Sequence, residues 1–112
     1  MSSISTHVLD LARGGPAPGV PVVLERLEGE AWVPVTRGVT DADGRVKDLV
    51  PRGGEATGTY RLTFETGAYF AAIGTRGFYP HVPVVFHVPA PGEHYHVPLL
   101  LGPYGYSTYR GS

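Results

Sequence analysis

Two histidines placed two residues apart are the feature of this sequence best suited to chemistry. The segment from Glu93 to Leu101 alternates, so a strand there puts His94 and His96 on one face and aliphatic or aromatic side chains on the other. Near the start of the chain, the same period places His7 on one face of a predicted strand with hydroxyl and apolar neighbours. Imidazole as a class titrates near neutrality, so such side chains facing a common groove could hold and move a proton during hydrolysis.

Two other interpretations of these histidines remain open. A strand histidine is commonly a solvated or hydrogen-bonded surface residue. A metal site is the second, because His7, His94 and His96 could supply three nitrogen ligands, but no carboxylate or spacing motif accompanies them. We therefore expect no metal at the site. The remaining histidines, His81 and His87, are assigned to structural or surface positions.

The segment from Thr40 to Arg45 reads Thr-Asp-Ala-Asp-Gly-Arg and predicts a tight turn. It resembles the start of a calcium loop, but the later glycine and the bidentate glutamate that such a loop requires are missing, which excludes calcium. Asp43-Gly44 suits a turn that needs a positive φ and delivers Arg45 onto a strand. There its guanidinium could hold a carbonyl or an anionic oxygen, the alternative being an ordinary surface arginine.

The C-terminal segment, residues 102–112, is rich in glycine, tyrosine and hydroxyl side chains. Because most chain ends fray, a tail of this composition predicts a segment that is tied down. It could be an edge strand with exposed tyrosines. It could also be a tail that inserts its hydroxyls and terminal carboxylate into a pocket or a subunit interface.

Short strands must position these groups, because 16 glycines and 11 prolines divide the sequence into segments rich in Val, Thr, Tyr and Phe. This pattern predicts an all-β sandwich of two packed sheets. The predicted strands are Ser5 to Leu11, Val22 to Glu28, Trp32 to Thr40, Val46 to Leu49, Thr59 to Glu65, Val82 to Val88, His94 to Leu101 and Tyr106 to Tyr109. One short helix is predicted over residues 67–73, with Thr66 as its N-cap and Gly74 at its C-terminus.

The size and composition favour a single globular domain over residues 1–112. A hydrophobic fraction of 42% with 17% charged residues excludes a disordered chain, and a net charge of −1 without a basic stripe excludes a nucleic-acid partner. The absence of cysteine excludes disulfides, thiolate nucleophiles and cysteine-based zinc sites. No apolar run approaches the roughly 20 residues of a membrane helix, and no signal peptide is visible, so we expect a cytosolic protein.

Five segments spread over nearly the whole chain form a specific combination. They are Ser5 to Asp10, the Thr40 to Arg45 turn, Gly77 to Val82, Tyr95 to Leu100 and the terminal Tyr109 to Ser112. Together they resemble the 5-hydroxyisourate hydrolases of the transthyretin-like family, with no departure at these motif positions. The terminal Tyr-Arg-Gly-Ser, the early histidine and the His-Val-Pro-Leu strand distinguish those enzymes from the hormone-carrying transthyretins that share their fold.

The resemblance implies a transthyretin-like sandwich of eight strands, in two four-stranded sheets with one short helix. It implies a homotetramer, a dimer of dimers, with active sites in the channel between the dimers. The implied reaction is hydrolysis of 5-hydroxyisourate to 2-oxo-4-hydroxy-4-carboxy-5-ureidoimidazoline in urate breakdown. No cofactor is expected, because a strained, electron-poor ring is already susceptible to attack by water.

The resemblance also implies that His7, Arg45 and His96 line this channel. We expect His7 to take a proton from water, while His96 orients the substrate or shares the proton relay. Arg45 is expected to stabilise the oxygen charge that develops as the carbonyl becomes tetrahedral.

The tail is expected to complete the site. Ser112 and its carboxylate would position the water or polarise a histidine, and the substrate-binding residues would be Tyr109, Arg110 and Gly111. Two alternatives remain: a carrier of a small ligand on the same fold, which an apolar channel would favour, and a structural domain whose tyrosine-rich tail docks a partner.

Overall fold

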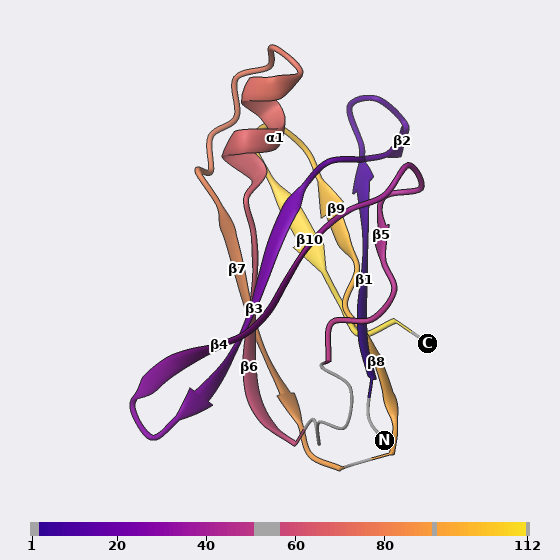
Figure 1. Ribbon diagram of the computed structural model, residues 1–112. Helices are drawn as coiled ribbons and strands as arrows, with labels where there is room; N and C mark the ends of the chain where they lie inside the picture. Colours follow the sequence, from indigo (N-terminus) through magenta and orange to yellow (C-terminus); the bar gives the residue numbers. More distant parts are fainter. Residues whose placement is uncertain (1–2, 51–56, 91, 112) are drawn as a thin grey trace.

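Two sheets pack face to face, with a helix at one end and a long hairpin at the other (Figure 1). The computed structural model describes residues 3–50, 57–90 and 92–111. In chain order its elements are β1 (Ser3–Asp10), β2 (Gly15–Pro16), β3 (Pro21–Glu28), β4 (Ala31–Val39), β5 (Arg45–Val46), β6 (Gly58–Phe64), α1 (Thr66–Ala72), β7 (Val82–Val88), β8 (His94–His96), β9 (Leu99–Leu101) and β10 (Tyr106–Thr108). The predicted all-β sandwich with one short helix is confirmed over these ranges.

The second sheet has the expected four strands in the order β4-β3-β6-β7, whereas the first sheet contains six strand segments. One reason is that the predicted strand from His94 to Leu101 is divided into β8 and β9, because Pro98 has no backbone N–H with which to continue the pairing. Another is β2, a two-residue pairing that the sequence pattern did not predict. The predicted strand from Val46 to Leu49 is reduced to β5, which begins one residue earlier and ends at Val46.

Strand β1 is the central strand of the first sheet. It pairs in parallel with β8 and β9 on one side and antiparallel with β2 and β5 on the other. Its outward face carries Ser3, Ser5 and His7, as a period of two predicts. The inward residues, each at most 1% exposed, are Ile4, Thr6, Val8 and Asp10.

The core lies between the sheets and includes one whole face of β8 and β9. The four residues predicted for that face are buried, at no more than 5% exposure: Tyr95, Val97, Leu99 and Leu101. From the second sheet, β6 and β7 contribute Leu62, Phe64 and Val82. With this face fixed by burial, His94 and His96 must project from the opposite side of the first sheet.

A buried carboxylate attaches helix α1 to the end of β1. Asp10 accepts a hydrogen bond from the Tyr69 hydroxyl at 2.7 Å. It also accepts the backbone N–H groups of Ala12 and Arg13 at 3.0 and 3.1 Å. These bonds replace the water that the carboxylate loses on burial, so the charge is tolerated in the core.

The helix begins one residue earlier than predicted, and the predicted N-cap is wrong. Glu65 occupies the N-cap position, whereas Thr66 lies in the helix and its hydroxyl donates to the Tyr79 carbonyl at 3.4 Å. Gly74, at φ 71°, ends the helix as predicted. No helix within the described ranges is long and apolar enough to cross a membrane.

Candidate active site

The turn between β4 and β5 carries Arg45 to the edge of β1. Asp41 Oδ1 accepts the backbone N–H groups of Asp43 and Arg45 at 2.9 and 3.0 Å. The N–H of Arg45 is the main reason that the pKa of Asp41 is lowered. Gly44 has φ 76°, and a Cβ there would lie 2.4 Å from the Val8 carbonyl oxygen. The predicted positive-φ turn is therefore confirmed, and glycine is the residue that fits it.

His7 and Arg45 face each other directly. They are paired across β1 and β5, so their side chains share the outward face of the first sheet. The Nε2 atom of His7 lies 2.9 Å from the carbonyl oxygen of Asp43. Because a carbonyl only accepts, a neutral His7 carries its proton on Nε2 and keeps Nδ1 as an acceptor. One turn thus presents Arg45 and orients the His7 ring.

His96 joins this pair through the parallel register of β1 and β8. Ser5 is its pairing partner, two residues from His7 along β1, and Ser5 Oγ lies 2.8 Å from His96 Nδ1. Partial burial lowers the pKa of His96, and the positive charges of Arg45, His94 and His7 lower it further, against a raising effect of a hydrogen bond to the Ser5 backbone. His96 is therefore a neutral imidazole at neutral pH.

The structure connects His96 to the hydroxyls of Ser5 and Ser3 and to the imidazole of His94, a connection that the sequence did not predict. Ser5 Oγ also lies 3.0 Å from His94 Nε2, and the Ser3 hydroxyl contacts His94 Nδ1. The rings of His94 and His96 are stacked, with centroids 6.3 Å apart and planes inclined by 16°. Alternation places Ser5 on the His7 face, but its link to the histidines depends on pairing between residues about 90 positions apart.

Arg45, His96 and the Ser5 and His94 side chains beside it line a polar groove of about 440 Å³ on the outward face of the first sheet. Its lining residues are Ser5, Thr6, Arg45, Val46, Lys47, His94 and His96. The lining contains two cationic side chains and no carboxylate, which suits a substrate rich in carbonyl or anionic oxygens. Lys47 is a lining residue that the sequence did not single out. Among the described residues, no cluster of three or more His, Asp or Glu side chains is placed to hold a metal ion.

The C-terminal tail is bonded to the strand that carries the imidazoles. The Gly111 N–H donates to the His96 carbonyl at 2.7 Å, and the Thr108 hydroxyl donates to the Pro98 carbonyl at 2.7 Å. A Cβ on Gly111 would lie 2.6 Å from Cδ2 of the His96 ring, so a larger residue would displace the imidazole. The prediction of a tied-down tail is confirmed up to Gly111, and Ser112 lies outside the described residues.

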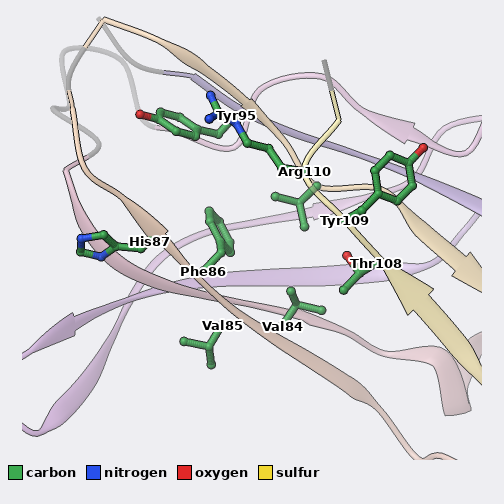
Figure 2. Close-up of a pocket in the computed structure, with 9 residues that line it drawn as sticks. Val84, Val85, Phe86, His87, Tyr95, Thr108, Tyr109 and Arg110 are labelled. Carbon is green, nitrogen blue, oxygen red and sulfur yellow. The ribbon is translucent and has the colours of Figure 1, made fainter.

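Tyr109 and Arg110 line a different hollow, of about 240 Å³, between β7 and the tail (Figure 2). The Arg110 guanidinium lies over the Tyr95 ring, 4.7 Å from its centroid, and 3.4 Å from Glu93 Oε1. Most of this lining is apolar: Val84, Val85, Phe86, His87, Tyr95, Val97, Thr108, Tyr109 and Arg110. Within one chain the structure therefore brings together His7, Arg45, His96 and Gly111, and it separates Tyr109 and Arg110 from them.

Comparison with known proteins places this chain in a family. A curated 5-hydroxyisourate hydrolase of Salmonella typhimurium is 52% identical over 109 residues, which cover 97% of this chain and 80% of the relative. The structure of Klebsiella pneumoniae 5-hydroxyisourate hydrolase is similar with a TM-score of 0.88 at 41% identity, covering 100% of both chains. Sea bream transthyretin in complex with thyroxine has a TM-score of 0.91 at 32% identity, covering 97% of this chain and 94% of that one. The family model described as "HIUase/Transthyretin family" matches residues 4–111, and the chain belongs to this family.

Proposed function

We propose that this chain is a 5-hydroxyisourate hydrolase, which opens the ring of its substrate with water to give 2-oxo-4-hydroxy-4-carboxy-5-ureidoimidazoline in urate breakdown. The observation that carries the proposal is the meeting of His7, Arg45 and His96 on one open face of the first sheet. Curated relatives with this enzyme name, at 43–52% identity, support it. The cytosolic location expected from the sequence stays a prediction.

The two imidazoles supply proton transfer in the proposed mechanism. Each is held through one nitrogen, His7 by the Asp43 carbonyl and His96 by the Ser5 hydroxyl, which leaves the other nitrogen of each ring for the reaction. We place His96 as the acceptor of the water proton, because its lowered pKa keeps it neutral at the pH of the cell. His7 orients the attacking water or the substrate beside Arg45. This exchanges the two roles expected from the sequence.

Arg45 stabilises oxygen charge in this mechanism. As water adds to the amide carbonyl, negative charge develops on the carbonyl oxygen, and a donor already aimed at that position stabilises the transition state more than the ground state. The turn holds the Arg45 backbone through Asp41, so the guanidinium starts from a fixed anchor. Lys47 adds a second positive charge to the same groove.

The tail completes the site in our proposal. Gly111 packs against the His96 ring, so the chain passes directly over the imidazole before its last residue. We propose that Ser112 and its carboxylate position the water or polarise a histidine. Tyr109 and Arg110 are proposed as substrate-binding residues, a role that depends on assembly because they lie outside the groove of a single chain.

Two open sheet edges support the proposed homotetramer. Strand β7 pairs only with β6, and β10 pairs only with β9, among the described strands. The apolar hollow of Figure 2 lies between these edges, and its lining residues Val85 and Tyr109 are 58% and 57% exposed. Edge strands with exposed apolar side chains favour pairing with another copy, which we propose as the dimer contact.

The proposed contact between dimers covers the outward face of the first sheet. The groove is open to solvent in one chain, and Arg45 and His94 at its rim are exposed. Covering this face with a second dimer would exclude water, which strengthens the electrostatic interactions of Arg45 with the substrate. The proposed assembly therefore places the active sites at the contact between dimers.

A carrier of a small ligand is the alternative that the fold alone leaves open, since sea bream transthyretin with bound thyroxine is as similar in structure as the hydrolase. The lining of the groove in this chain argues against the carrier alternative. An apolar ligand would leave the imidazoles, the guanidinium and the hydroxyls of the groove without partners, which costs free energy. The polar groove therefore favours hydrolysis over storage.

The test is to generate 5-hydroxyisourate with urate oxidase and to follow its ultraviolet decay with and without this protein. We expect decay well above the spontaneous rate. His7→Ala, Arg45→Ala and His96→Ala should each lower kcat/KM by about 100-fold or more, because each removes a proton carrier or an oxyanion donor. Their assembly, followed by sedimentation, should be unchanged. Decay at the spontaneous rate with the unaltered protein would defeat the enzyme proposal, and full activity in one variant would remove that residue from the mechanism.

A further inference from the structure

Four side chains form a continuous hydrogen-bonded chain from the groove to solvent, which we call the serine–histidine chain: Ser3, His94, Ser5 and His96. Ser5 Oγ lies 2.8 Å from His96 Nδ1 and 3.0 Å from His94 Nε2, and the far nitrogen of His94 contacts the Ser3 hydroxyl. Ser5 is 7% exposed, whereas His94 is exposed. The buried hydroxyl therefore joins a partly buried imidazole to one that is exposed to water.

The chemistry of these groups allows only two coherent arrangements of protons. A hydroxyl has one hydrogen to donate, so Ser5 donates to one imidazole and accepts from the other. In the first arrangement, His96 and His94 both carry their proton on Nδ1, and His96 Nε2 is free to accept. In the second, both rings carry it on Nε2, and His96 Nε2 is ready to donate. The two arrangements correspond to a base and an acid, and both leave the rings uncharged.

The proposed reaction needs both forms of the same group. Water loses one proton as its oxygen bonds to the carbonyl carbon, and the nitrogen of the broken C–N bond must gain one. The second water proton is lost to solution when the new carboxyl group ionises near neutral pH. A site that already holds Arg45 disfavours an imidazolium at His96, in keeping with the lowered pKa of that ring.

We propose that Ser5 and His94 are positioning residues that let His96 act first as base and then as acid by relaying protons to and from solvent. This inference rests on the proposed function. When His96 Nε2 accepts the water proton, its Nδ1 proton moves to Ser5, the Ser5 proton moves to His94 Nε2, and His94 Nδ1 releases a proton towards Ser3 and solvent. When Nε2 protonates the leaving nitrogen, each transfer reverses and His94 takes up a proton. The chain is then restored, and no oxidant or other reactant is consumed.

The charges around His96 favour transfer in this direction. Arg45 and Lys47 line the groove from β5 and the residue after it, and His7 is the pairing partner of Arg45 on β1. Arg45 and His7 raise the energy of a proton held near His96. His94 lies on the far side of Ser5 and is exposed, so a proton gains hydration as it moves along the chain.

The experiment compares Ser5→Ala, Ser5→Thr and His94→Phe in the 5-hydroxyisourate assay at saturating substrate. Ser5→Ala breaks the chain, Ser5→Thr keeps the hydroxyl, and His94→Phe keeps a stacked ring without nitrogens. We expect kcat to fall about tenfold in Ser5→Ala and His94→Phe, with KM within about twofold of its original value, because proton transfer is impaired and substrate contacts are retained. Added imidazole buffer should restore most of the loss, and Ser5→Thr should retain most of kcat.

Thr59→Ala is the matched control, because Thr59 makes the same type of hydroxyl–imidazole contact, 3.2 Å to His87 Nδ1, on the other sheet. It should have unchanged kcat. The ¹⁵N shifts of the two rings give a readout without substrate: His94 and His96 should share one tautomer preference in the unaltered protein and lose that match in Ser5→Ala. Unchanged kcat in Ser5→Ala and His94→Phe, or a loss that added imidazole does not relieve, would overturn the relay. An unaltered protein without activity would instead refute the proposed function.

Discussion

The pKa of His96 connects the chemistry of the site to its immediate neighbours. Burial is the largest cause of its lowered pKa, and the positive charge of Arg45 is the second largest. Arg45→Gln removes that charge while keeping a polar side chain of similar reach. We expect the His96 pKa to rise towards the ordinary value of about 6.5, because protonation no longer meets a neighbouring cation. An NMR titration of the His96 ring protons measures it.

Lys47→Gln is the matched control for this titration. Lys47 lines the same groove but is not among the groups that shift His96, so its removal should move the pKa less than removal of Arg45 does. An equal rise in both variants would contradict the assignment. The lowered pKa of His96 also makes the stability of the protein depend on pH. Because His96 binds a proton less readily in the folded state than in the unfolded state, the free energy of unfolding falls as the pH is lowered through about 6.5. This fall should be smaller in Arg45→Gln.

At the scale of an element, the turn from Asp41 to Arg45 determines whether the site forms. Gly44→Ala would force a Cβ into the left-handed region and against the Val8 carbonyl oxygen, 2.4 Å away. We expect a loss of about 3 kcal/mol in the free energy of unfolding, the sum of backbone strain and steric displacement. Because the same turn orients His7 and carries Arg45, kcat/KM should fall as well. Urea unfolding and the substrate assay measure the two effects.

Gly29→Ala separates strain from displacement. Gly29 also has a positive φ, 64°, but a Cβ there would meet nothing within 4 Å. Its cost should be about 1 kcal/mol, from the left-handed backbone alone, with unchanged kcat/KM. Equal losses of stability in Gly44→Ala and Gly29→Ala, with full activity in both, would contradict this prediction. The close contact between the turn and β1 would then not be required to position His7 and Arg45.

Local signals account for the parts of the fold that could be predicted. Alternation assigned the core face of His94 to Leu101, and Asp-Gly identified the turn before Arg45. The errors are also local in origin: a threonine before a helix suggested a cap, but Thr66 is buried and bonds to Tyr79 instead. Competition between such partners is decided by tertiary packing, which a single sequence does not display.

At the scale of the whole molecule, the proposed dimer contact makes Val85 sensitive to charge. Val85 lies on the open edge strand β7 and is 58% exposed in one chain. Val85→Lys should weaken self-association at least about tenfold, because a charge would have to be buried or the edge left unpaired. Analytical ultracentrifugation over a range of concentrations measures it.

Val39→Lys is the control, since Val39 has a similar exposure of 59% but lies on β4, at the other edge of the second sheet. It should assemble like the unaltered protein. Equal dissociation of both variants would indicate general destabilisation, and unchanged assembly in Val85→Lys would rule out β7 as the contact.

The arrangement of the site could be predicted only in part. The sequence identifies His7, Arg45 and His96 through their types, their faces and a family resemblance. The antiparallel pairing of His7 with Arg45 and the parallel pairing of Ser5 with His96 come from strand order and register, which pattern alone does not determine. For this reason Ser3, Lys47 and the link between Ser5 and the two imidazoles emerged from the structure.

The parallel pairing of β1 with β8 has a consequence for how the protein becomes active. Ser5 and His96 are separated by 91 positions, so β1 is synthesised long before the strand that will lie beside it exists. A chain dominated by such distant pairings gains little from local contacts and folds on the slow side, in milliseconds to seconds. No partly made chain can hold the proton-transfer groups together. The rate at which hydrolytic activity recovers during refolding would therefore report the rate at which β1 pairs with β8.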